Sequence, residues 1–222
     1  MLSTSRVGAK LHKVVAALRF LVGSSIVFAI AWQVSDRILH NVFRPAEYFS
    51  YFTIITSLFT AVILGVSAAG LLRAGSDSER MLKYRLAVTS AYVIVSVVYN
   101  ALLRNQPPSA ADAGYIWPTP PNEILHVYAP AIVLLEWIIV SPSVRLRLKQ
   151  AWLVLIFPLA WLALTIVRGL IFGWWPYWFL DPTDQGGVPQ MVMYILIISA
   201  FFTLVGFGLT AINRWRARGK TA

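Results

Sequence analysis

The chain contains no cysteine, and this absence excludes several kinds of protein at once. Without thiols there are no disulfide bonds, no thiolate nucleophile, no cysteine-bound zinc and no cysteine-bound iron–sulfur cluster. Charge is also scarce, since only 13% of the 222 residues are charged and only 9 are Asp or Glu. Soluble domains carry about 25% charged residues, so the composition argues against a soluble protein.

The chain is rich instead in apolar residues, which make up 58% of the sequence. Six long apolar runs predict membrane-spanning helices, because a bilayer needs about 20 apolar residues per helix. They cover residues 14–34, 49–72, 86–103, 123–140, 151–173 and 190–212. The predicted fold is therefore all-α: a polytopic integral membrane protein of the cell membrane, with a single six-helix domain over residues 1–222.

The net charge of +10 follows the predicted topology. Of the 19 Lys and Arg residues, Arg37, Arg44 and Arg104 lie in loops on one side, and Arg168 lies inside a span. The others flank the opposite ends of the spans: Arg6, Lys10, Lys13, Arg19, Arg73, Arg80, Lys83, Arg85, Arg145, Arg147, Lys149, Arg214, Arg216, Arg218 and Lys220. The positive-inside rule then predicts that both termini are cytoplasmic. The charge requires no nucleic-acid partner, and we expect it to meet anionic lipid headgroups.

Two ionisable residues, His126 and Glu136, interrupt the fourth span. Ionisable groups are costly in hydrocarbon, so each marks a candidate functional site. Pro130 has no N–H to donate to the His126 carbonyl, so we expect the helix to loosen beside the imidazole. Glu136 lies about 15 Å deeper along the axis. We interpret it as a structural charge paired with Arg168, a tyrosine or the cytoplasmic interface.

Two arginines, Arg19 and Arg168, lie inside the first and fifth spans. We expect Arg19 to extend to the cytoplasmic interface and Arg168 to extend outward, because long basic side chains keep their charged ends in water. A haem bound by His126 would need a second axial histidine, and His40 lies in a loop without a matching helix position. We therefore expect no cofactor and no bound metal.

Four polar residues share one depth in the predicted topology. Thr53 and His126 begin spans that enter from the outer face, and Asn100 and Arg168 end spans that arrive there. This convergence predicts a polar pocket that opens toward the outer leaflet. The alternative is that helix ends are simply more polar than helix middles, and that hydroxyls such as Thr53 bond back to their own helix. Composition does not separate the two.

Three segments carry a family resemblance: residues 51–53 (Tyr-Phe-Thr), residues 122–126 (Asn-x-x-x-His) and residues 175–181 (Trp-Pro-Tyr-Trp-Phe-Leu-Asp). With the order and spacing of the spans, they resemble the bacterial six-helix relatives of the androgen-induced membrane proteins. That family includes the vertebrate hydrolases of fatty-acid-hydroxy-fatty-acid esters. The resemblance implies that Thr53 and His126 form the catalytic pair of a membrane-embedded lipid ester hydrolase.

The implied chemistry is consistent with these residue types. A threonine hydroxyl becomes a useful nucleophile when a neighbouring base removes its proton, and a neutral imidazole suits that task. Glu123, or else Asp181, would orient the ring. Asn122 and Asn100 are candidate donors to the oxyanion.

The expected partner is a membrane lipid, with an acyl ester as the substrate. A protein from a different class, a non-enzymatic lipid-binding or transport protein, would use the same pocket without cleaving the lipid. The two alternatives differ in whether Thr53 and His126 act on an ester or only line its binding site.

Overall fold

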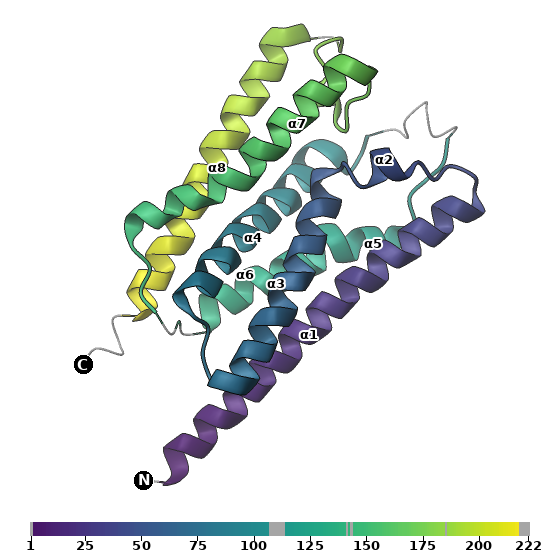
Figure 1. Ribbon diagram of the computed structural model, residues 1–222. Coiled ribbons are helices and arrows are strands. Elements are labelled where there is room, and N and C mark those ends of the chain that lie inside the picture. The colour runs from purple at the N-terminus through teal and green to yellow at the C-terminus, as the bar shows by residue number, and fades with distance from the viewer. Residues whose placement is uncertain (1, 107–113, 141, 143, 185, 218–222) are drawn as a thin grey trace.

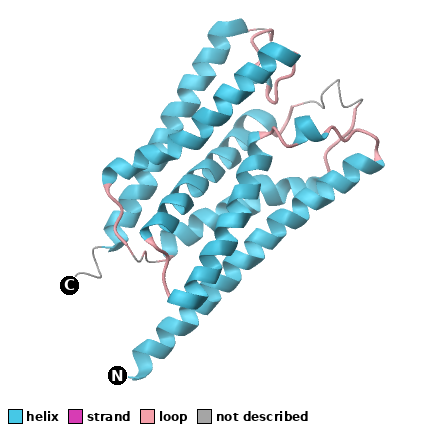
Figure 2. Ribbon diagram, viewed as in Figure 1, coloured by secondary structure: helices cyan, strands magenta, loops and turns pink. Residues whose placement is uncertain are grey.

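The computed structural model describes residues 2–106, 114–140, 142, 144–184 and 186–217. This part of the chain is helical, with short connecting loops and no strand (Figure 2). Six of its helices are long and apolar enough to cross a membrane, which confirms the prediction of six spans. Arg218 and Lys220, which count toward the basic side of the sequence, lie outside the described residues.

The first three spans are single long helices, and the last is as well. They are α1 (Leu2–Leu39), α3 (Phe52–Ala74), α4 (Glu79–Val98) with a π-helical turn η1 (Tyr99–Leu103), and α8 (Gly187–Ala217). The fourth span joins α5 (Thr119–Glu123), a π turn η3 (Ile124–Tyr128) and α6 (Ala129–Ile139). The fifth joins a 3-10 helix η4 (Leu148–Leu155) to α7 (Ile156–Phe172). The short α2 (Pro45–Tyr48) and η5 (Trp178–Leu180) lie between spans.

Helix α4 lies at the centre of the bundle and packs against α3, α6, α8 and η4 (Figure 1). Helix α1 packs along the length of α3, where Gly23 allows a close approach. A Cβ atom on Gly23 would lie 3.3 Å from the Ala61 carbonyl oxygen. Helices α7 and α8 form one flank of the molecule, and most of the α7 surface is exposed to the surroundings.

The bundle has two chemically different ends. At one end, which we call the basic end, α1 begins, α8 ends, and the turn 75–78 joins α3 to α4 (Figure 1). At the other, which we call the aromatic end, α2, η5 and the segment 173–184 gather, with tryptophan and tyrosine side chains in mutual contact. The prediction that the basic end faces the cytoplasm depends on the charge distribution alone.

Two π turns distort the spans at the aromatic end. In η3 the Ala129 N–H bonds to the Ile124 carbonyl, five residues back instead of four. Pro130 follows directly and cannot make the α-helical bond to the His126 carbonyl, so the structure confirms the expected loosening beside the imidazole. In η1 the Arg104 N–H bonds to the Tyr99 carbonyl at 2.8 Å. Such turns are frequent at functional sites.

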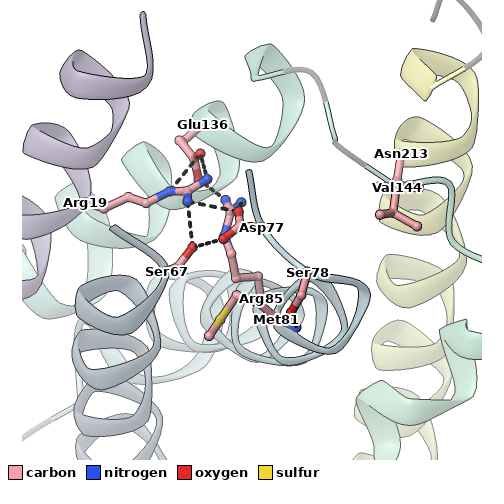
Figure 3. A network of polar contacts seen from close by, with 9 residues as sticks. All are labelled: Arg19, Ser67, Asp77, Ser78, Met81, Arg85, Glu136, Val144 and Asn213. Carbon is pink, nitrogen blue, oxygen red and sulfur yellow. Dashed lines mark hydrogen bonds and ion pairs between the residues drawn. The ribbon is translucent and has the colours of Figure 1, made fainter. Parts of the chain in front are cut away.

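A buried network of charges ties four spans together near the basic end (Figure 3). Arg19 from α1 donates to Glu136 on α6 at 2.7 Å and to Asp77, in the α3–α4 turn, at 2.9 Å. Arg85 from α4 donates to Asp77 at 3.0 Å and also pairs with Glu136. Ser67 of α3 bonds to both Arg19 and Asp77.

The network corrects two expectations from the sequence. Arg19 is only 2% exposed, so it does not extend to the interface. Glu136 is a paired charge, as expected, but its partners are Arg19 and Arg85 and not Arg168. A charge in a low-dielectric interior is stable only when it is paired and hydrogen-bonded. Two arginines and two carboxylates satisfy this condition within the protein, without help from water at the interface.

Candidate functional site

A narrow cavity lies at the aromatic end between α3, α4, α7 and α8, and we call it the aromatic-end cavity. It holds about 690 Å³ of empty space, counting the part that is open to the surroundings, but only about 80 Å³ is wide enough to admit water. Its wall is almost wholly apolar, and its polar side chains are Thr53, Tyr177 and Ser199. No charged side chain lines it among the described residues. A slot of this shape suits a hydrocarbon chain.

Thr53 lies in this cavity wall, in the first turn of α3, and is 7% exposed. The first N–H groups of a helix have no partner within the helix. The Thr53 N–H donates instead to the Tyr177 hydroxyl oxygen at 3.4 Å. That hydroxyl also interacts with the Thr53 side chain and with the Phe52 backbone. Burial raises the pKa of Tyr177 above its ordinary value, so the hydroxyl keeps its proton.

Aromatic packing fixes the position of Tyr177. Its ring stacks on Phe179 with the planes 7° apart and contacts Trp161 and Tyr51. The Trp161 indole N–H donates to the Ser50 carbonyl at 2.9 Å, which joins α7 to the segment before α3. The segment 173–184 therefore contributes Tyr177, Phe179 and Leu180 to the cavity wall, and the Tyr177 hydroxyl is one of the polar groups there.

Arg168 also joins α7 to the segment before α3. Its guanidinium donates to the Ala46 carbonyl at 2.7 Å, bonds to the Ser50 hydroxyl and lies 4.5 Å from the centre of the Trp174 ring. The residue stays at the aromatic end, as expected, but it binds the backbone of α2 there. These contacts join the end of α7 to the residues that precede α3.

His126 lies in the π turn η3 and is half-buried. Its Nδ1 lies 2.8 Å from the Asn122 carbonyl oxygen, and its ring stacks on Tyr99 with the centroids 4.0 Å apart. A carbonyl oxygen only accepts, so this contact assigns the proton of the neutral ring to Nδ1 and leaves a lone pair on Nε2. Nε2 makes no hydrogen bond to the described residues, and its lone pair makes the imidazole a candidate base.

The residues expected to support His126 have other partners. Glu123 pairs with Arg104 at 2.8 Å, and Asp181 accepts from the Thr183 N–H at 2.8 Å. The imidazole is oriented by the Asn122 carbonyl instead. The Asn122 side-chain amide donates to the Tyr99 hydroxyl at 2.7 Å.

The second candidate oxyanion donor is also engaged. Asn100 bonds to the Ser96 carbonyl and accepts from Arg104, both at 2.8 Å. Neither Asn122 nor Asn100 lines the aromatic-end cavity, and the side-chain amide of each already donates to another group.

Thr53 and His126 lie at the same end of the bundle, on elements that contact each other, α3 and η3. The structure does not join them by a hydrogen bond. Thr53 faces the cavity and Tyr177, whereas His126 faces Tyr99. The catalytic pair therefore stays a prediction, and its formation would require the two side chains to approach each other.

The hydroxyls of α3 do not all bond back to their own helix. Ser57 donates to the Tyr92 hydroxyl at 3.3 Å, and Thr60 bonds back to the Thr56 carbonyl at 2.7 Å. The Thr56 hydroxyl is fully buried and has no hydrogen-bond partner among the described residues. The polar start of α3 is therefore more than the ordinary polarity of a helix end, because its hydroxyls face the bundle interior.

Sequence reasoning missed two members of the site, Tyr177 as the partner of Thr53 and Tyr99 as the partner of His126. Both tyrosines belong to segments that the sequence marks as aromatic or polar, and neither segment indicates a contact with another span. Arg85 and Asp77 were missed in the same way. The only signal for them was an acidic residue in a turn that is otherwise flanked by basic residues.

Comparison of the chain with protein-family models, with curated proteins and with solved structures finds no match. The class of protein is defined by the fold: an all-helical chain with six helices that are long and apolar enough to span a membrane. The resemblance to the androgen-induced membrane proteins stays a prediction based on three sequence motifs.

Proposed function

We propose that this protein binds a membrane lipid in the cell membrane, with one acyl chain in the aromatic-end cavity and the lipid's ester group beside Thr53 and Tyr177. The observation that carries the proposal is the composition of the cavity wall, which is apolar except for Thr53, Tyr177 and Ser199. Each buried methylene group contributes about 0.8 kcal/mol. An acyl chain is therefore a better occupant than a charged solute.

The polar end of the cavity suits an ester. The two hydroxyls of Thr53 and Tyr177 carry two protons between them, and one proton is enough to link them. The other is available to an acceptor such as a carbonyl oxygen. Because Tyr177 keeps its proton, it can donate at any ordinary pH, and a neutral acceptor needs no charged partner.

Filling the cavity tests the binding proposal. Ile198 lines the cavity from α8, and the adjacent Ile197 is 56% exposed on the outer surface of the same helix. Ile198→Trp should reduce labelling of the purified protein by a photoreactive diazirine fatty-acid ester about tenfold, because the indole occupies the space of the chain. Ile197→Trp adds the same side chain outside the cavity and should leave the labelling unchanged. Equal labelling of both variants would refute this binding site.

Ester hydrolysis is the second candidate function, favoured by the free lone pair on His126 Nε2 and by the position of Thr53 in the cavity wall. In this reaction His126 accepts the Thr53 hydroxyl proton as Oγ1 attacks the ester carbonyl, and the alcohol leaves with that proton. Water then cleaves the acyl-threonine, with His126 again as the base. The reaction requires the two side chains to meet, which the described arrangement does not show.

Turnover of a long-chain p-nitrophenyl ester decides between the two functions. If the pair is catalytic, Thr53→Ala and His126→Ala should each lower turnover about 10²–10⁴-fold. The double variant should be little worse, because residues that act as a unit are not additive. Thr53→Ser keeps the nucleophile and should retain activity. Thr60→Ala removes a buried hydroxyl from the same helix and is the matched control.

Each outcome has a defined meaning. A wild-type protein that is labelled by the fatty-acid ester but does not cleave the p-nitrophenyl ester is a lipid-binding protein. Full turnover by Thr53→Ala would show that Thr53 is not the nucleophile. A fluorophosphonate adduct on Thr53 that is lost in His126→Ala would support the pair.

A further inference from the structure

The basic end contains a second and wider cavity, which we call the basic-end cavity. It is bounded by the start of α1, the α3–α4 turn, the end of α6 and the end of α8. About 470 Å³ of it is wide enough to admit water, compared with about 80 Å³ in the aromatic-end cavity. It is large enough for a small solute or a lipid headgroup.

The polar wall of this cavity is mainly basic. Arg19, Arg85 and Arg216 line it together with His12, and among the described residues the only carboxylate in the lining is that of Asp77. Arg19 and Arg85 are 2% and 4% exposed, so they are held in place by the bundle and do not move freely as surface arginines do. Glu136 pairs with both but does not line the cavity.

Asp77 occupies a position that suits an anion. Its Oδ2 accepts from Nη1 of Arg19 at 2.9 Å and from Nη1 of Arg85 at 3.0 Å, and its Oδ1 accepts from the Ser67 hydroxyl. Figure 3 marks the contacts within this group of residues with dashed lines. Unlike Glu136, which is part of α6, Asp77 belongs to the turn 75–78, where Gly75 has a φ of +69°. A turn can move without breaking a helix.

One donor of this group lacks an acceptor. Nε of Arg85 is buried and has no hydrogen-bond partner among the described residues. Buried guanidinium N–H groups normally have acceptors, because an unsatisfied one loses its hydration without compensation. Asp77 accepts from only some of the guanidinium N–H groups of Arg19 and Arg85, and an anion with three or four oxygens would accept from more of them.

We propose that the basic-end cavity binds the phosphate group of an acidic ligand, and that the Asp77 carboxylate holds the phosphate's place when no ligand is bound. Arginine guanidinium groups bind phosphate through paired N–H donors. Once Asp77 is displaced, the two positive charges of Arg19 and Arg85 are balanced only by the single negative charge of Glu136. The ligand must therefore supply one negative charge. The phosphate would meet Arg19, Arg85 and Ser67, with Arg216 at the mouth.

The apolar part of the wall indicates what is attached to the phosphate. Leu11, Val15, Leu82 and Trp137 line the same cavity. A phosphate diester of a lipid offers both the charge and the apolar chains, whereas a free phosphate offers only the charge. Both sources share the chemistry that the arginines recognise, and the two are separated by the probes used in the test.

The test measures binding to the purified full-length protein by native mass spectrometry. The probes are dioctanoyl phosphatidylglycerol, dioctanoyl phosphatidylcholine and inorganic phosphate. We expect the wild-type protein to retain phosphatidylglycerol in preference to phosphatidylcholine. Asp77→Asn removes the competing charge and should raise phosphatidylglycerol affinity about tenfold. Glu79→Gln makes the same charge change two residues away, outside the cavity lining, and should leave the affinity unchanged.

A second pair of variants keeps the proposal testable if Asp77→Asn does not fold. Leu11 and Val14 are 57% and 64% exposed on α1, and only Leu11 lines the cavity. Leu11→Trp should narrow the mouth and lower phosphatidylglycerol retention severalfold, while Val14→Trp should not. Arg216→Gln should also lower it.

The probes also distinguish the source of the phosphate. Displacement of phosphatidylglycerol by inorganic phosphate supports a free-phosphate site, and retention in its presence supports a lipid site. Equal retention of both lipids by the wild-type protein and by Asp77→Asn, with no effect of inorganic phosphate, would overturn the proposal.

Discussion

The aromatic end and the basic end bury polar groups in opposite ways. Around the aromatic-end cavity the buried polar groups are neutral: the Tyr177 hydroxyl, which accepts from the Thr53 N–H, and the His126 imidazole, which stacks on Tyr99. The basic end uses full charges, which Arg19, Arg85 and their two carboxylates neutralise among themselves. A buried hydroxyl that keeps a hydrogen bond loses little free energy of solvation, whereas a buried charge without a partner loses far more.

This difference indicates which end can rearrange. Moving one member of the charge network leaves another charge without its partner, so the network holds α1, α3, α4 and α6 in register. The aromatic-end groups are joined by single neutral hydrogen bonds, which contribute about 0.5–1.5 kcal/mol each. We therefore expect the chemistry that needs motion to occur at the aromatic end, and the basic end to change only when an anion replaces Asp77.

The largest expected effect concerns the orientation of the two ends in the membrane. The basic end carries nearly all of the Lys and Arg residues, so it should face the cytoplasm. A reporter that is active only in the cytoplasm should be active when fused after Ala222. The same reporter inserted between Thr183 and Asp184 should be inactive. The reverse pattern would place Thr53 and His126 on the cytoplasmic side and exclude an outward-facing lipid pocket.

Removal of one charge from the network should have the next largest effect. Glu136→Ala leaves Arg19 and Arg85 with one carboxylate between them and should lower the free energy of unfolding by about 3–5 kcal/mol. Thermal or denaturant unfolding in detergent measures this. Glu79→Gln, in the exposed pair with Lys83, should change little. A Glu136→Ala protein as stable as the wild type would show that the network does not hold the helices.

Loss of the Tyr177 hydroxyl should have a smaller effect. Tyr177→Phe removes the acceptor of the Thr53 N–H and should destabilise the protein by about 1 kcal/mol. It should also weaken retention of the fatty-acid ester severalfold. Tyr194→Phe removes a hydroxyl from a tyrosine of α8 that packs on Phe179 but does not line the cavity, so it serves as the control. If the two variants retain the ester equally, Tyr177 is not part of the ester site.

The smallest expected effect is a pH dependence at the aromatic end. Burial raises the pKa of Tyr177, so the fold favours its protonated form. Its contribution to stability is complete below the unfolded pKa of about 10 and is lost as the pH rises through the folded value. The wild-type protein should therefore lose more stability than Tyr177→Phe as the pH rises above about 10. Parallel melting curves of the two proteins over that range would contradict a buried Tyr177 hydroxyl.

Much of the fold could be predicted from the sequence because it depends on local properties. The six spans follow from run length and hydropathy, and the loosening of the helix beside His126, which takes the form of a π turn, follows from the missing N–H of Pro130. The prediction for Arg19 was wrong for the opposite reason. A lone arginine in a span is expected to extend to the membrane interface, and nothing near Arg19 in the sequence indicates that Asp77 and Glu136 are its partners.

For the candidate site, the sequence predicted only how deep in the membrane its residues lie, and not which residues touch. Thr53 and His126 were placed at one end of the bundle by topology, and both lie at the aromatic end of the structure. Their contacts depend on the rotation of each helix about its axis, which packing decides. A rotation of about 100° per residue separates neighbouring positions on a helix, so equal depth does not imply contact.

The sequence by itself determined the class of the protein, the number and order of its spans and the separation of its basic and aromatic ends, because these depend on composition and on distance along the chain. Only the tertiary structure decided that Thr53 meets Tyr177, that His126 stacks on Tyr99 and that Arg19 shares two carboxylates with Arg85. These contacts join residues far apart in the chain. They exist because close packing in a low-dielectric interior favours arrangements in which buried polar groups have hydrogen-bond partners, and here those partners come from distant segments of the chain.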